Sequence, residues 1–368
     1  MVNPPMITPG AQVRQQARQQ QRRVAPWRRE LAQAVTDPAE LLDLLGLDAA
    51  LLPAARRAAK LFGLRVPRHF IARMRRGEPD DPLLRQVLPL AEECEAVAGF
   101  RPDPVGDLQA ARAPGVLAKY RGRALLMTTG GCAINCRYCF RREFPYGEGA
   151  LTPARLAGAV DALAGMKGLE EVILSGGDPL SLPTTRLARI GEALQALPGL
   201  RRLRIHTRTP VVLPARVDGE LLDWVRGLPW RAVIVLHANH PRELCGDVCE
   251  ALAALADSGA TLLNQSVLLR GVNDDEDTLA ELSTKLFEAG VLPYYLHLLD
   301  RASGTAHFEV DTAEASGLHS ALQARLPGYL VPRLVREIEG APCKTSQDAA
   351  GFPGAVLESR PAGERTSS

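Results

Sequence analysis

Six short apolar segments, separated by segments with helical spacing, constrain the fold of this chain more than any other feature. The apolar segments are 124–129, 171–175, 203–207, 232–236, 261–267 and 293–299. Helical patterns between them cover 154–164, 187–197, 243–256 and 279–289. Strands that alternate with helices in this way pair as a parallel sheet with right-handed crossovers. The sequence therefore predicts either a doubly wound α/β sheet or a closed or partial barrel.

Unusual polar residues follow each of these predicted strands, and they favour the barrel. Three cysteines follow the first strand, and the later strands end near Ser175–Asp178, His206–Pro210, His237–His240, Asn264–Ser266 and Asp300. A barrel brings all its strand ends to one face, whereas a doubly wound sheet concentrates its site at one switch point. We expect a partial (β/α)6 barrel of the TIM type with an enzyme site at the carboxyl ends of its strands.

The chain divides by composition into four regions. We expect an N-terminal helical extension over 1–110, a barrel core over 111–311, a C-terminal segment over 312–350 and a disordered tail over 351–368. Thr36-Asp37-Pro38 is typical of a helix start, and the tail is small and polar. The arginine-rich stretch 10–30 has a single aromatic residue, Trp27, among its arginines and no repeated interleaving, which favours a solvated extension over a nucleic-acid arm.

Charge and hydropathy exclude several classes of protein. Lys and Arg number 44 and Asp and Glu 42, a net charge of +2, which argues against a partner that is nucleic acid or a membrane surface. We find no apolar run of 18 residues and no apolar segment of a secretory signal near the start. Seven cysteines, an odd number, argue against a disulfide framework. We expect a cytoplasmic protein.

Three of the seven cysteines lie within eight residues, in the CxxxCxxC motif of Cys132, Cys136 and Cys139. Three thiolates on one loop can hold three corners of a [4Fe–4S] cluster and leave the fourth iron open for a substrate or cofactor. A structural zinc ion normally takes four ligands, commonly from two CxxC pairs, and no second pair lies nearby. The motif therefore favours an iron–sulfur cluster over a zinc site or a chance grouping.

This loop, placed after the first strand of a six-unit barrel, resembles that of the radical S-adenosylmethionine (SAM) enzymes. The resemblance implies that the open iron binds the methionine part of SAM and that an electron then cleaves SAM to a radical. Ser175-Gly176-Gly177-Asp178 resembles the motif that receives the SAM amino group, and His237 and Gln265 match positions near the adenosine. The resemblance to radical SAM enzymes also implies an electron donor of the flavodoxin or ferredoxin type.

Further motifs narrow the resemblance to the lysine 2,3-aminomutase family, over about residues 80–346. These motifs lie at 130–142, 208–214, 239–241 and 264–274. The implied reaction is an isomerisation of L-α-lysine to (R)-β-lysine. Segments 35–38 and 65–88 resemble the branch (EpmB) that makes β-lysine for elongation factor P. That branch implies a pathway link to elongation factor P and to the ligase that transfers the lysyl group.

The family uses pyridoxal 5′-phosphate (PLP) beside the cluster, and the resemblance indicates which residues would hold it. Lys344 matches the PLP lysine, although the preceding segment 340–343 is less glycine-rich than is usual in the family. The alternative for this residue is a plain surface lysine. Lys119, Tyr120 and Arg123 match positions by the PLP ring or phosphate, and a phosphate dianion requires fixed cations.

The resemblance also assigns the two charged ends of the substrate. Arg141 matches the arginine that binds the substrate carboxylate, for which a guanidinium fork is suited. Asp300 and Glu337 match the two acidic residues for the ε-ammonium, and Glu337 stands where the family has aspartate. A buried ammonium requires such partners. The alternatives are a structural ion pair for Arg141 and a surface position for Glu337.

Two rival functions and one departure from the family complete the sequence-based expectations. An aminomutase for glutamate or another amino acid is the first rival, and Asp300 with Glu337 argues against it. A nucleic-acid-binding protein with a metal cluster is the second, and the near-neutral charge argues against it. Clostridial-type members carry zinc-binding cysteines that this chain lacks, because Asp275 follows Asp274 and no cysteine follows Cys343. We expect no structural zinc.

Overall fold

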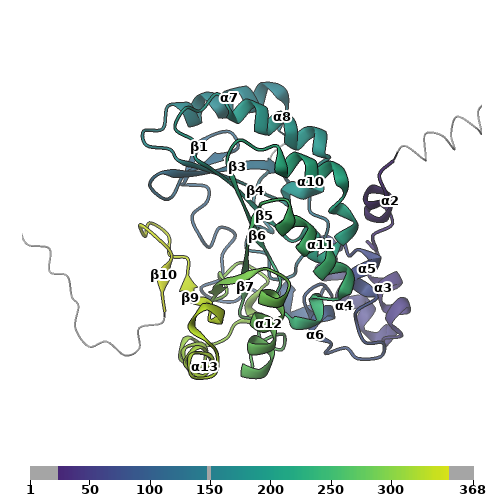
Figure 1. Cartoon of the computed structure of the whole chain (residues 1–368). Coiled ribbons are helices and arrows are strands. Elements are labelled where there is room, and N and C mark those ends of the chain that lie inside the picture. Colours follow the sequence, from purple (N-terminus) through teal and green to yellow (C-terminus); the bar gives the residue numbers. More distant parts are fainter. Residues whose placement is uncertain (1–23, 147–150, 348–368) are drawn as a thin grey trace, which may run out of the picture.

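The computed structural model describes residues 24–146 and 151–347, and a ten-stranded sheet forms its centre (Figure 1). The sheet order follows the chain from β1 to β10, with β3 to β9 parallel and the remaining pairs antiparallel. Within the described residues β1 and β10 are the two edges, so the barrel is partial, as predicted. The strands are β1 (Ala111–Ala113), β2 (Val116–Leu117), β3 (Arg123–Thr129), β4 (Glu171–Gly176), β5 (Arg202–Thr207), β6 (Arg231–Leu236), β7 (Thr261–Val267), β8 (Leu292–His297), β9 (Arg333–Arg336) and β10 (Thr345–Ser346).

The barrel helices cover one side of this sheet (Figure 1). Their inward residues, such as Leu187, Ile190 and Leu194 of α8, join the strands in one large apolar core. The bounds of the helices are α7 (Pro153–Ala164), α8 (Thr184–Leu194), α9 (Thr209–Val212), α10 (Gly219–Arg226), α11 (Gly246–Asp257), α12 (Glu276–Glu288) and α13 (Thr312–Arg325). Short 3₁₀ turns connect them at η3 (Pro179–Ser181), η4 (Pro214–Arg216), η5 (Pro241–Glu243), η6 (Ala306–Phe308) and η7 (Gly328–Leu330). The predicted strands and helices of the barrel are confirmed, whereas β1, β2, β9, β10, α9, α10 and α13 are not predicted from the sequence.

The N-terminal extension is helical, as predicted, and has an apolar core of its own. Its elements are α2 (Pro26–Ala32), α3 (Pro38–Leu45), η1 (Ala49–Leu51), α4 (Leu52–Leu61), α5 (Arg68–Ile71), α6 (Pro82–Arg85) and η2 (Ala91–Cys94). Asp37 caps α3 by accepting a hydrogen bond from the Ala39 amide, which confirms the predicted helix start. No described helix is both long and apolar enough to cross a membrane. The arginine-rich stretch before Val24 and the predicted tail 351–368 lie outside the described residues.

The N-terminal extension is fastened to the cysteine loop, which follows β3. Ala133 and Ile134 of this loop are part of the extension's apolar core. Arg137 lies between Cys136 and Cys139 in the sequence, and its side chain is fully buried. It donates to Glu93 at 2.8 Å and to the Phe62 carbonyl at 2.7 Å. Arg142 also donates to Glu93, at 2.7 Å. One buried carboxylate therefore binds two arginines of the loop.

Replacement of Glu93 by Ala tests how much this attachment contributes to stability. The change leaves two buried guanidinium groups without their carboxylate, which costs about 3–5 kcal/mol. We expect that loss in the free energy of unfolding, measured by urea denaturation. Glu92→Ala, on the exposed side of the same turn, serves as the control and should shift it by less than about 0.5 kcal/mol. Equal effects of the two changes would contradict the attachment.

Candidate active site

One cavity of about 550 Å³ lies at the carboxyl ends of the parallel strands. Its volume is typical of sites for small molecules and cofactors. All sixteen site residues predicted from the sequence line it, namely Lys119, Tyr120, Arg123, Cys132, Cys136, Cys139, Arg141, Ser175, Gly176, Gly177, Asp178, His237, Gln265, Asp300, Glu337 and Lys344. The structure thus brings together residues that lie up to 225 positions apart in the chain, from Lys119 to Lys344.

The glycine pair that ends β4 allows the cysteine loop to approach the sheet. A Cβ atom at Gly177 would lie 2.3 Å from the Gly131 carbonyl oxygen, and one at Gly176 would lie 2.6 Å from that of Thr129. Gly176 also has a φ of +108°, which strongly favours glycine. Both glycines therefore allow the end of β4 to pack closely against the backbone of the cysteine loop.

Asp178 has a structural role in the described residues. Its carboxylate accepts hydrogen bonds from the Thr207 hydroxyl at 2.7 Å and from the Arg208 and Thr209 amides at 2.7 and 2.9 Å. It also accepts one from the Leu180 amide at 2.9 Å. These bonds join the end of β4 to the end of β5, so Asp178 orients the loops around the cavity.

The three cysteines line the same cavity and are close enough to influence one another's pKa values. Burial raises the pKa of Cys139 to about 11, and a bound metal would reverse this by stabilising the thiolate. No three His, Cys, Asp or Glu side chains of the described residues are grouped as ligands of a single metal ion. A cluster, in contrast, distributes its cysteines over separate irons, and three thiols on one cavity wall fit that donor set.

A chain of alternating charges begins at Arg141, close to the cysteines, and runs along the cavity. The Arg141 guanidinium donates to Asp107 at 2.6 Å, and Asp107 lies 2.6 Å from the Lys119 ammonium. Lys119 is 3.3 Å from Glu337, which also forms an ion pair with Lys344. The chain thus links the residue predicted for the substrate carboxylate to the lysine predicted for PLP.

The two acidic residues predicted for the substrate ammonium differ in charge state. Although burial opposes it, the cations of Lys344 and Lys119 hold the pKa of Glu337 at about 2. Burial raises the pKa of Asp300 to about 7, and the nearby Lys344 only partly offsets it. Within the described residues no ion pair involves Asp300. Glu337 is therefore a paired carboxylate, and Asp300 is a carboxyl group that titrates near neutrality.

The residues that line the cavity near Glu337 and Lys344 fit a phosphorylated aromatic cofactor. Arg123 and Arg333 line the cavity, and neither has an ion-pair partner among the described residues, so both are free to bind a phosphate. The Tyr120 hydroxyl donates to Glu337 at 2.8 Å, and its ring faces the Arg123 guanidinium at 5.5 Å. Lys344 lies 5.9 Å from the ring centre of Tyr295.

Three buried histidines, which are neutral, also line the cavity. His237 Nε2 is 2.9 Å from the Gln265 amide nitrogen, and burial lowers the pKa of His237 to about 3. Burial likewise lowers the pKa values of His206 and His297 well below the usual range. Their Nε2 atoms have no hydrogen-bond partner in the described residues, so they can bind a polar ligand.

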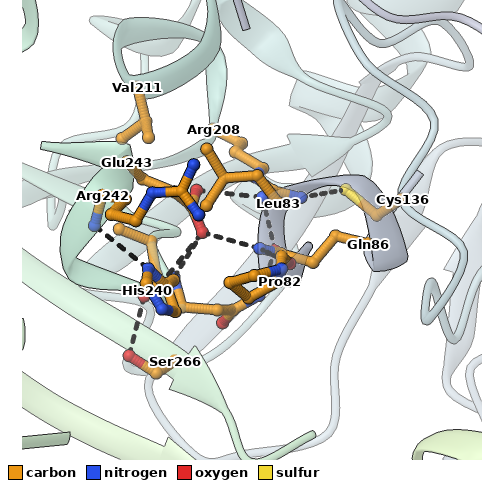
Figure 2. Close-up of polar contacts among 12 residues, drawn as sticks. Pro82, Leu83, Gln86, Cys136, Arg208, Val211, His240, Arg242, Glu243 and Ser266 are labelled. Atoms are coloured by element: carbon orange, nitrogen blue, oxygen red, sulfur yellow. Dashed lines mark hydrogen bonds and ion pairs between the residues drawn. The ribbon is translucent and has the colours of Figure 1, made fainter. Parts of the chain in front are cut away.

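A second polar network lies behind the cysteines, and Figure 2 shows its central residues. Arg208 donates to the Cys136 sulfur at 2.8 Å, to Gln86 at 2.7 Å and to Glu243 at 2.9 Å. The Gln86 amide also donates to Glu243 at 3.1 Å. Gln86 comes from the N-terminal extension, whereas Arg208 follows β5 and Glu243 ends η5. The network therefore joins both parts of the fold at one cysteine.

The sequence-based prediction missed several residues of the cavity. It gave no role to Asp107, which belongs to no recognisable motif, although the structure places it in direct contact with Arg141. Arg208 was noted as part of a motif, without a function. Tyr294 and Tyr295, whose ring centres are 3.8 Å apart, lie within an apolar strand and carried no signal of their own.

Comparisons with known proteins agree with this geometry. The family model of the radical SAM superfamily matches residues 126–282. The chain is 50% identical to the L-lysine 2,3-aminomutase of Escherichia coli over 323 residues, which cover 88% of this chain and 94% of that protein. It is 46% identical to the one of Haemophilus influenzae, with 87% of this chain and 94% of that protein covered.

A more distant relative is the L-lysine 2,3-aminomutase of Clostridium subterminale. It is 31% identical over 322 residues, which cover 87% of this chain and 77% of that protein. With identities of up to 50% over nearly the whole length of its relatives, the chain belongs to the L-lysine 2,3-aminomutase family of radical SAM enzymes.

Proposed function

We propose that this protein is a radical SAM, PLP-dependent L-lysine 2,3-aminomutase that converts L-α-lysine into (R)-β-lysine. One observation carries the proposal: a single cavity is lined both by the three cysteines and by Lys344 with its carboxylate neighbour Glu337. Cys132, Cys136 and Cys139 would hold a [4Fe–4S] cluster, and Lys344 would hold PLP. The bound cofactors supply radical hydrogen abstraction and stabilisation of the migrating amino group.

The remaining predicted residues would surround these cofactors. Lys119, Tyr120 and Arg123 would contact PLP, because they lie beside Lys344 and include a cation without an ion-pair partner. Gly176 and Gly177, with Ser175 and Asp178, would shape the SAM site from the end of β4. His237 and Gln265, which line the same cavity, would contact SAM as neutral hydrogen-bonding groups.

The charges of the cavity match both ends of a lysine molecule. Arg141 would bind the α-carboxylate, and Asp107 holds its guanidinium in place through a 2.6 Å hydrogen bond. Asp300 and Glu337 would bind the ε-ammonium. In the free chain Glu337 pairs with Lys344, so engagement of Lys344 with PLP would release this carboxylate for the substrate. A glutamate side chain, which is negative, would be repelled here.

The product and the partners follow from the sequence resemblance of segments 35–38 and 65–88. We propose that the β-lysine is transferred to elongation factor P by its lysyl-transferring ligase. An electron carrier of the flavodoxin or ferredoxin type would reduce the cluster. All seven cysteines are free thiols, which suits a reducing compartment such as the cytoplasm.

The reaction itself is the first test. The protein is incubated anaerobically with SAM, PLP, a reductant and L-lysine, and the products are separated by chiral chromatography. We expect (R)-β-lysine, and its formation should depend on SAM, on PLP and on the reductant. A protein in which Cys132, Cys136 and Cys139 are all Ala should bind no cluster iron and form no product. Deoxyadenosine without β-lysine would move the search to another amino acid, and a full iron count in the triple variant would contradict the cluster site.

Lys344→Ala tests the proposed PLP attachment. The substitution removes the amine, so we expect loss of the visible absorbance that a protein-bound PLP shows when it is linked to lysine. Turnover should fall by at least 100-fold, as for removal of a group that acts in the reaction itself. Lys167→Ala, an exposed lysine on the same chain, is the control and should retain both signals. Persistence of the absorbance in Lys344→Ala would assign PLP to another lysine.

Asp300 predicts how lysine binding depends on pH. Its pKa of about 7 means that the carboxyl group gains a proton, and loses its negative charge, as the pH falls from 8 to 6. The KM for lysine should therefore rise toward low pH, by about tenfold per pH unit at most below the pKa. Asp300→Asn should raise the KM and remove this dependence. Unchanged kinetics in Asp300→Asn would favour the rival reading of another amino acid substrate.

A further inference from the structure

Arg208 makes a hydrogen bond to only one of the three cysteines, and its position is fixed by several partners. Its Nη1 donates to the Cys136 sulfur at 2.8 Å and to the Tyr138 hydroxyl at 2.6 Å. The side chain is almost fully buried, with 5% of its surface exposed. A guanidinium presents its donors in one rigid plane, so the partners of Nη2 also fix the direction of Nη1.

The partners of Nη2 come from distant parts of the chain. Nη2 donates to Gln86 at 2.7 Å and to Glu243 at 2.9 Å (Figure 2). Glu243 is held in turn by the Asn239 amide at 3.0 Å. These partners fix the plane of the guanidinium and hold a cation against one sulfur atom.

Arg208 and Glu243 form a buried ion pair whose net charge is close to zero. Arg208 carries one positive charge, and Glu243, which is fully buried, carries one negative charge on the far side of the guanidinium from Cys136. The sulfur therefore faces the cation, while the carboxylate is separated from it by that cation. In a medium of low polarity both charges act strongly on a neighbouring group.

We propose that Arg208 is a positioning residue that directs the Cys136 sulfur and raises the reduction potential of the bound cluster. The proposal rests on the proposed function only in that the three cysteines hold a [4Fe–4S] cluster. A hydrogen bond to a ligand sulfur and a nearby positive charge both favour the cluster state with one more electron. The cluster accepts that single electron from a one-electron carrier protein, and no bond forms or breaks.

Arg208 and Glu243 should act in opposite directions. Arg208→Gln removes the cation and should lower the potential. Glu243→Gln removes the opposing anion, keeps Arg208 and should raise it. A loss of packing alone would not give opposite signs. Arg208→Lys retains the charge without the fork, and its potential should lie between those of Arg208→Gln and the unchanged protein.

The experiment is an EPR-monitored redox titration of the reconstituted protein without SAM, together with iron and sulfide analysis. For Arg208→Gln we expect a tenfold lower ratio of reduced to oxidised cluster at equal donor potential, which corresponds to about 59 mV. Arg216→Gln is the matched control, because Arg216 is also a buried arginine, and its hydrogen bonds and ion pair within the described residues go to Leu180, Leu182, Thr184 and Asp218 and to none of the three cysteines. It should leave the potential unchanged.

The outcomes separate this proposal from the proposed function. Unchanged potentials in Arg208→Gln and Glu243→Gln, at full iron content, would overturn the role of Arg208. Shifts of the same sign in both variants would also overturn it. If Arg208→Gln fails to hold iron, the sign of the shift in Glu243→Gln decides. Absence of a cluster in the unchanged protein would refute the proposed function instead.

Discussion

The buried ion pairs of Glu93 with Arg137 and Arg142 are the interaction on which the site depends. Over its described residues 130–146 the cysteine loop has no strand or long helix of its own, so its shape comes from contacts with other segments. Glu93 holds the loop from the N-terminal side, and the Gly177 contact with Gly131 holds it from the sheet. These two contacts constrain the loop that carries the three cysteines.

A second feature of the cavity is its arrangement of charged side chains. Arg141, Asp107, Lys119, Glu337 and Lys344 form an alternating series in which each inner charge has an opposite neighbour. Buried charges are stable only when oppositely charged groups lie next to them. A substrate with one carboxylate and two ammonium groups can exchange partners with this series and leave no charge isolated.

The sequence predicts most of the sheet because each buried parallel strand is a short apolar run followed by polar residues. It fails where the signal is weaker. α10 (Gly219–Arg226) has only two fully buried residues, and β9 (Arg333–Arg336) begins and ends with arginine. In the site, the sixteen residues identified from motifs all line one cavity. Asp107 has no motif, because its role is defined by Arg141 and Lys119, and these neighbours are distant in sequence.

The contacts of Gln86 have a consequence for how this architecture can be modified. Its backbone carbonyl accepts a hydrogen bond from the Arg137 amide at 2.9 Å, and its side chain contacts Arg208 and Glu243. The N-terminal extension and the barrel are therefore joined through the cysteine loop and are not two exchangeable modules. A chimera that joined this barrel to a foreign extension would need to supply matching donors and acceptors for the loop 135–142.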